Sequence, residues 1–184
     1  LGILSYSLKL YFDFYGYSLM ACGVGEMLGY DLPVNFRHPY AACSMSDFWR
    51  RWHITLGKWF TDYIYIPLGG NRLGRKRQLI NLLVVWLCTG IWHGSTLNFL
   101  LWGLFLFVII AAEKLLKIDR NRNPLSHLYM IPAILICWAF FAVTDISQLG
   151  VFFSRLFPLF SKSTGLLPRD YILYGKQYGL MLII

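Results

Sequence analysis

The chain has little charge, and formal charge is missing altogether from long stretches of it. Charged residues make up 14% of its 184 residues, against about 25% in an ordinary soluble domain. No Asp, Glu, Lys or Arg occurs in residues 78–112, whereas one membrane span needs only roughly 20 apolar residues. Residues 128–143 also lack formal charge. We therefore predict an all-α, multi-pass transmembrane protein with broken or re-entrant helices, and the alternative is an unusually apolar soluble helical bundle.

Common catalytic and binding signatures are absent as well. The sequence contains no GxSxG nucleophile elbow, no phosphate-binding P-loop and no GxGxxG dinucleotide fingerprint. Its four cysteines, Cys22, Cys43, Cys88 and Cys137, have neither metal-binding nor redox spacing. We interpret them as structural and expect no metal site.

Basic residues outnumber acidic ones by 17 to 9. They cluster beside apolar runs, at residues 72–77 and 114–122, and this pattern is typical of loops on the cytoplasmic side of a membrane. No nucleic-acid recognition motif accompanies them. We therefore expect the lipid bilayer rather than nucleic acid as partner, and a multi-pass protein of the cell (plasma or inner) membrane.

Both ends of the chain lie in apolar sequence, and the first residue is not Met. The basic start and small-residue cleavage site of a signal peptide are missing at Leu1. We expect residues 1–184 to form a single transmembrane domain that is truncated at both ends.

The first apolar stretch, residues 1–29, contains Lys9 and Asp13. These residues are four apart, so they share a helix face and can pair. Inside a span they would be either a neutralised structural pair or a functional one. Residues 30–45 contain several helix-interrupting residues and are predicted to be irregular.

An amphipathic helix is predicted over residues 47–65, with Ser46 as its N-cap. Trp49 and other aromatic residues form one face, and Arg50, Arg51 and Lys58 lie on the other. This arrangement is typical of a helix that lies in the membrane interface. Pro67 and two glycines after it are expected to end the helix, and a basic loop is expected to follow.

The uncharged run 78–112 would measure about 52 Å as one straight helix, which is too long for a bilayer core of about 30 Å. It must therefore break, and Gly90, Gly94 and Ser95 mark the expected position. His93 lies at this break. Unwound backbone at that depth has to be buried in protein or to line a cavity, so we expect a hairpin with a functional site at its turn and both basic clusters on the same side.

Further elements are predicted after this hairpin. A span is expected over residues 128–143, with Pro132 as a candidate break. A shorter apolar stretch covers residues 149–160, and another span is expected to begin near Tyr171.

Two of the four histidines are candidates for chemistry, namely His93 at the break and His53 on the amphipathic helix. A histidine in apolar surroundings is often structural, but polar groups within a membrane are costly and are usually retained for function. Haem ligation by the two rings is one alternative. A transporter or channel subunit with a buried histidine site is another.

Four segments together resemble the membrane-bound O-acyltransferase family, and in particular its bacterial branch that acetylates polysaccharides. They are residues 11–18 (YFDFYGYS), 48–54 (FWRRWHI), 65–72 (YIPLGGNR) and 90–94 (GIWHG). Their order and spacing match over about residues 6–114. The glycine-rich third segment resembles the polysaccharide-acetylating branch more than the branch that transfers D-alanine to teichoic acid.

This resemblance implies an enzyme with a funnel or tunnel through the bilayer, of which the chain would be the C-terminal, catalytic part. His93 occupies the position of the catalytic base, and His53 that of a second polar residue, which either orients the substrate or stabilises developing charge. A neutral imidazole near a hydroxyl can remove its proton as attack begins. The substrate-binding residues implied by the matching segments are Asp13, Trp49, Arg50, Arg51, Asn71 and Trp92.

The implied reaction moves an acyl group, in the first instance acetyl, to hydroxyls of an extracytoplasmic polysaccharide, directly or through a partner protein. The expected donor is acetyl-CoA or another acyl thioester, and no tightly bound cofactor is expected. The basic residues Arg50, Arg51 and Lys58 would steady an anionic donor, or they would meet lipid headgroups instead.

Overall fold

A computed structural model describes residues 2–118, 124–156 and 176. It separates into two compact units, residues 1–146 and 147–184. Most of the described residues are helical, and they form no β-strand, only one isolated antiparallel bridge between Phe36 and Trp52. The predicted all-α class is therefore confirmed.

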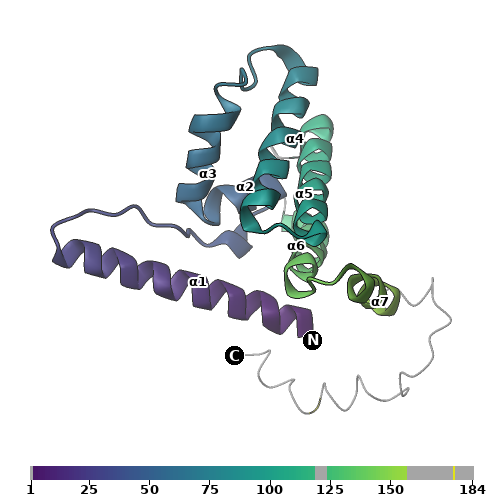
Figure 1. Ribbon diagram of the computed structural model, residues 1–184, viewed down its shortest axis with the longest axis horizontal. Helices are drawn as coiled ribbons and strands as arrows, with labels where there is room; N and C mark the ends of the chain where they lie inside the picture. The colour runs from purple at the N-terminus through teal and green to yellow at the C-terminus, as the bar shows by residue number, and fades with distance from the viewer. Residues whose placement is uncertain (1, 119–123, 157–175, 177–184) are drawn as a thin grey trace. The chain divides into compact units, whose positions relative to one another are not determined.

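Five α-helices of more than ten residues and several shorter helical segments make up the described chain (Figure 1). The first unit contains α1 (Gly2–Met27), η1 (Pro39–Ala41), α2 (Met45–Arg51), α3 (Ile54–Phe60), η2 (Thr61–Tyr65), α4 (Gly74–His93), α5 (Leu97–Leu116), η4 (Pro124–Ser126) and α6 (His127–Ala142). Helix α7 (Ile146–Leu156) belongs almost entirely to the second unit.

Helices α4 and α5 form the predicted hairpin, and two glycines let their backbones approach closely. A Cβ atom on Gly90 would lie 2.5 Å from the Phe99 carbonyl oxygen, and one on Gly103 would overlap the Trp86 carbonyl oxygen. The chain turns after His93, where Gly94 has an extended backbone and a Cβ atom would lie 2.5 Å from the ring of Phe99. Gly90 was expected at the break, but it lies inside α4, because its lack of a side chain serves helix packing instead.

The described residues of the two basic clusters lie at the same end of the hairpin, since α4 begins and α5 ends there. Arg75, Lys76 and Arg77 occupy the first turn of α4 rather than a loop, because the helix already begins at Gly74. Lys114 lies in the last turn of α5. That this end faces the cytoplasm stays a prediction.

The predicted helix over residues 47–65 is interrupted, which corrects the interpretation of one interfacial helix. Its N-cap is Ser44 rather than Ser46, and the Ser44 hydroxyl accepts a bond from the Asp47 N–H at 3.0 Å. Helix α2 ends at Arg51, and α3 begins only after His53, whose backbone is left-handed (φ 47°). Phe48 of α2 and Trp52 directly after it are both buried in the core, so the aromatic face of α2 packs against protein.

The segment after η2 follows the prediction more closely. The chain leaves the helix in a series of turns in which Gly69 (φ 100°) and Gly70 (φ 57°) adopt left-handed backbones that favour glycine. Asn81 of α4 is fully buried and donates to the carbonyls of Leu68 (3.1 Å) and Gly70 (2.9 Å). These two hydrogen bonds attach the glycine-rich turn to α4 of the hairpin.

Helix α6 passes through Pro132 without a break, contrary to expectation. Proline there removes one backbone bond, to the carbonyl four residues earlier. Continuation is favoured because the following turns bury Ile134, Cys137 and Trp138 in the core. The core also contains Trp102, whose indole N–H lies 2.9 Å from the Cys137 sulfur.

Among the described residues, α5 is the one helix that is both long and apolar enough to cross a membrane, and the shorter α6 is also apolar. The apolar stretch predicted over residues 149–160 is helical as far as Leu156. The span expected near Tyr171 lies outside the described residues.

Candidate active site

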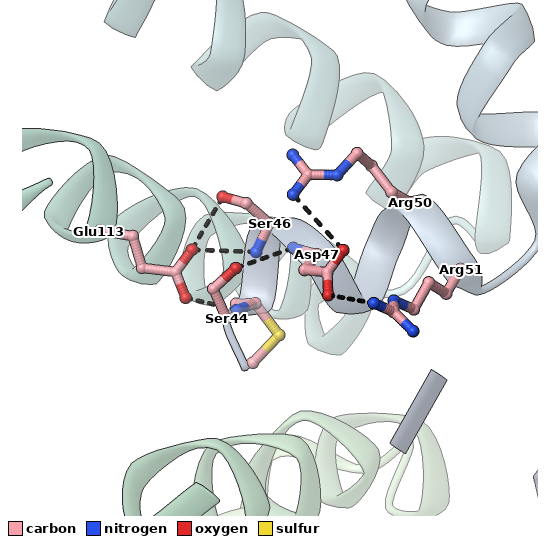
Figure 2. Close-up of polar contacts among 7 residues, drawn as sticks. Ser44, Ser46, Asp47, Arg50, Arg51 and Glu113 are labelled. Atoms are coloured by element: carbon pink, nitrogen blue, oxygen red, sulfur yellow. Dashed lines mark hydrogen bonds and ion pairs between the residues drawn. The ribbon is translucent and has the colours of Figure 1, made fainter. Parts of the chain in front are cut away.

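The N-terminus of α2 is fastened to α5 by the carboxylate of Glu113, which is 2% exposed. Figure 2 shows this carboxylate facing the first turn of α2. It accepts bonds from the backbone N–H groups of Met45 and Ser46, and from the Ser46 hydroxyl at 2.8 Å. The Tyr129 hydroxyl of α6 donates to it as well, at 2.8 Å. A carboxylate suits this position because the first N–H groups of a helix lack partners within the helix.

The C-terminus of α2 is held by the extended segment around Asn35. The Arg37 N–H donates to the Arg51 carbonyl, and the Ile54 N–H donates to the Asn35 carbonyl, each at 3.0 Å. These bonds enclose the left-handed turn at His53. Histidine is one of the residues that adopt this conformation more readily than most.

The ring of His53 has both polar and aromatic neighbours. Its Nδ1 lies 3.3 Å from the Asn35 side-chain oxygen, and the ring of Phe14 packs edge-on against it with centroids 4.7 Å apart. Burial lowers the pKa of His53 below its usual value, because the charged form is poorly solvated there. This lowering favours the neutral ring at pH 7.

His93 ends α4 and lies among aromatic rings. Its ring centroid is 5.0 Å from those of Trp102 on α5 and Phe141 on α6, both in edge-on geometry. Trp92, the preceding residue, has its ring 4.7 Å from that of His93 and 6.2 Å from that of His53. Three helices therefore fix the position of the His93 imidazole.

His53 and His93 line one cavity of about 540 Å³, although 40 positions separate them in the sequence. The walls are largely apolar and include Trp49, Trp52 and Trp86. Three cationic residues also line it: Arg50, Lys58 and Lys114. The cavity thus combines neutral imidazole, apolar wall and positive charge, which suits a ligand with a reactive group, an apolar part and an anionic part.

The predicted substrate-binding residues fall into two groups. Trp49 and Arg50 line the cavity. The other four lie outside its lining. Arg51 pairs with Asp47 at 2.8 Å, and Asp13 pairs with Lys9 at 3.8 Å on the exposed surface of α1. Asn71 is exposed in the turn before α4, and Trp92 is 56% exposed beside the two histidines. The expected Lys9–Asp13 pair is confirmed, whereas the binding roles of all six residues stay predictions.

Two residues of the site were missed from the sequence. Asn35 lies in a segment for which the sequence predicts nothing beyond irregular structure, and its contacts with His53 depend on the fold. Glu113 is the first charged residue after the uncharged run, and this placement was the available signal for a buried, functional carboxylate.

Comparison with known proteins gives the family. The family model of MBOAT, the membrane-bound O-acyltransferase family, matches residues 1–144. This match extends beyond residues 6–114, over which the sequence motifs carried the resemblance.

Curated relatives agree with this match. The chain is 38% identical over 160 residues to the probable alginate O-acetylase AlgI of Pseudomonas putida, covering 85% of this chain and 33% of that protein. It is 40% identical over 151 residues to the peptidoglycan O-acetyltransferase of Helicobacter pylori, covering 79% and 29%. It is 35% identical over 141 residues to the teichoic acid D-alanyltransferase of Streptococcus thermophilus, covering 67% and 33%. The chain thus spans about a third of the length of these relatives, and it belongs to the membrane-bound O-acyltransferase family.

Proposed function

We propose that the protein is a multi-pass membrane enzyme that transfers an acyl group, most simply acetyl, from a thioester to a hydroxyl of an extracytoplasmic polysaccharide. The observation that carries this proposal is the meeting of His93 and His53 at one cavity. The names of the alginate and peptidoglycan relatives support a polysaccharide as the final acceptor. Transfer takes place directly or through a partner protein that carries the acetyl group onward.

The proposed reaction uses His93 as general base. The acceptor hydroxyl attacks the thioester carbonyl carbon, and His93 takes the hydroxyl proton as the new C–O bond forms. The tetrahedral intermediate then collapses, the C–S bond breaks, and the proton on His93 passes to the departing thiolate. The imidazole ends the cycle neutral, so no redox partner or metal is required.

The donor is proposed to be acetyl-CoA or another acyl thioester. Arg50, Lys58 and Lys114 line the cavity and suit the anionic part of such a donor. The apolar walls suit the part that carries the acyl group. If the donor entered the cavity by a route away from these cations, they would contact lipid headgroups instead.

D-alanyl transfer to teichoic acid is a second candidate, supported by the 35% identity to the D-alanyltransferase. Chemical analysis of the product distinguishes the two functions. Base-labile acetate on an extracellular polymer would support the first proposal, whereas base-labile D-alanine would support the second.

The decisive test is His93→Gln in the full-length protein, produced as the sole copy in cells. Loss of a positioned base lowers a rate by roughly 100- to 10,000-fold, so polymer acetylation should disappear while the amount of protein in the membrane stays normal. His38→Asn is the control, because His38 is exposed and left-handed and does not line the cavity. Near-normal acetylation by the His93 variant would remove the general-base role.

The same purified protein separates the remaining alternatives. A haem absorption band that is lost on changing either histidine would favour the cytochrome interpretation. Substrate flux without any acylated product would favour a transporter.

A further inference from the structure

The orientation of the Asn35 side chain is fixed by one unambiguous donor. The backbone N–H of Thr55 can only donate, and it lies 3.2 Å from the Asn35 Oδ1 atom. The Thr55 hydroxyl donates to the same oxygen at 2.6 Å, while the Asn35 amide nitrogen donates to the Ser18 hydroxyl at 3.2 Å. A flipped amide would place its N–H₂ group against a backbone N–H, so the oxygen has to face Thr55.

This orientation determines which nitrogen of His53 carries the hydrogen. The His53 Nδ1 atom faces the same Asn35 oxygen, which accepts hydrogen bonds and cannot donate them. A contact between Nδ1 and this oxygen is therefore favourable only if Nδ1 carries its hydrogen. A neutral imidazole has a single N–H, so Nε2 is left with a free lone pair.

We propose that Asn35 is a positioning residue that holds His53 as the Nδ1–H tautomer, so that its Nε2 accepts a hydrogen bond from a second hydroxyl of the acceptor. The single hydrogen of the attacking hydroxyl is thereby left for His93. The sequence left two roles open for His53, substrate orientation and stabilisation of developing charge. An oxyanion needs a hydrogen-bond donor, but the only N–H of neutral His53 is already directed to Asn35. His53 therefore orients the acceptor through this second hydroxyl, and this assignment of a catalytic role rests on the proposed function.

The backbone supports the same assignment. The Asn35 carbonyl accepts from the Ile54 N–H at 3.0 Å, directly after the left-handed residue His53. One residue thus holds both the main chain and the ring of His53. A sparsely populated backbone conformation that is fixed by its surroundings is a feature of pre-organised sites.

The tautomer can be observed without any turnover. Full-length protein labelled with ¹⁵N-histidine is studied by NMR in detergent micelles, and the His53 signals are assigned by their loss in His53→Gln. We expect a protonated Nδ1 and an unprotonated Nε2 in the wild type and in Thr55→Val. Asn35→Ala should move His53 toward the Nε2–H tautomer that free histidine prefers. An Nε2–H tautomer in the wild type would overturn the proposal.

The catalytic consequence is tested by three variants with matched chemistry. Asn35→Ala should lower acyl transfer by about tenfold, the size expected for one lost hydrogen bond in the transition state. Thr55→Val removes a bond to the same oxygen but leaves His53 its partner, and it should change the rate by less than about threefold. Equal losses in these two variants would mean that Asn35 only anchors the loop, which would overturn its role on His53.

Asn35→Asp provides a pH readout that a purely structural role would not move. The carboxylate still accepts from Nδ1, so most of the activity should return relative to Asn35→Ala. Its negative charge also raises the pKa of His53, and protonated His53 cannot accept a hydrogen bond from the acceptor. The acid side of the rate–pH profile should therefore shift to higher pH, and an unshifted profile would overturn the proposal. A wild type with the expected tautomer but no acyl transfer would refute the proposed function and still confirm what Asn35 does to the ring.

Discussion

His53 and His93 line the same cavity, but their surroundings hold them in different ways. His53 lies in the turn that follows the short helix α2, and this turn is held by hydrogen bonds to Asn35, while the other end of α2 is held by Glu113. His93 sits at the end of a long helix and packs against Trp102 and Phe141, and its ring forms no hydrogen bond with other side chains in the described part of the chain. A hydrogen bond to an imidazole determines which ring nitrogen carries the hydrogen, whereas packing determines only where the ring lies. A base that has to take up and return a proton suits the second environment.

The largest loss of stability is expected from Glu113→Gln, which changes the hydrogen bonds at the start of α2, the helix that precedes His53. The amide retains one oxygen and places an N–H₂ group against donors of Met45 or Ser46, so at least one buried donor loses its acceptor. Hydrogen bonds to charged groups contribute about 1.5–3 kcal/mol each, and we expect a loss of about 3 kcal/mol in the stability of the full-length protein. Thermal unfolding in detergent measures it.

Ser46→Ala is the control for this experiment. It removes the 2.8 Å bond from the Ser46 hydroxyl but leaves the carboxylate and both backbone donors in place. The expected loss is about 1 kcal/mol. If Glu113→Gln were no worse than Ser46→Ala, the carboxylate charge would not be what fastens α2 to α5.

The packing around His93 is tested by Gly103→Ala. The added methyl group would overlap the Trp86 carbonyl oxygen, so α4 and α5 must separate and Trp102 must move against His93. Overpacking of this kind costs about 1–3 kcal/mol, and acyl transfer should fall together with the melting temperature. Gly23→Ala on α1 is the control, because nothing lies within 4 Å of its new methyl group and alanine favours helix. A Gly103 variant with normal stability would mean that the hairpin tolerates a wider spacing.

The hairpin could be predicted from the sequence because its signal is local. A run of 35 uncharged residues is too long for one span, and the glycines near His93 leave few positions for the turn. The pairing of Lys9 with Asp13 was predictable for the same reason, since helical spacing alone brings the two residues together.

The region around His53 was harder to predict because its structure depends on distant partners. The periodicity of residues 47–65 fits a single amphipathic helix, and nothing local marks a left-handed residue at position 53. Asn35, 18 positions earlier, forms the hydrogen bonds at the interruption near His53. Glu113, more than 60 positions later, forms those at the start of α2. Hydrogen bonds over such separations leave no periodic pattern in the sequence.

The smallest effect is expected from Asp13→Asn, which belongs to neither histidine environment. Asp13 lies in a segment that resembles the family, but its side chain is 65% exposed, pairs with Lys9 at 3.8 Å and does not line the cavity. Exposed ion pairs contribute about 0–1 kcal/mol, so stability should change by less than 1 kcal/mol. Acyl transfer should change by less than about threefold, which corresponds to about 0.65 kcal/mol. Lys9→Met removes the same pair from the other side and should match it in both measurements. If Asp13→Asn lowered transfer tenfold while Lys9→Met did not, Asp13 would contact the substrate in the full-length protein, and the binding site would extend along α1.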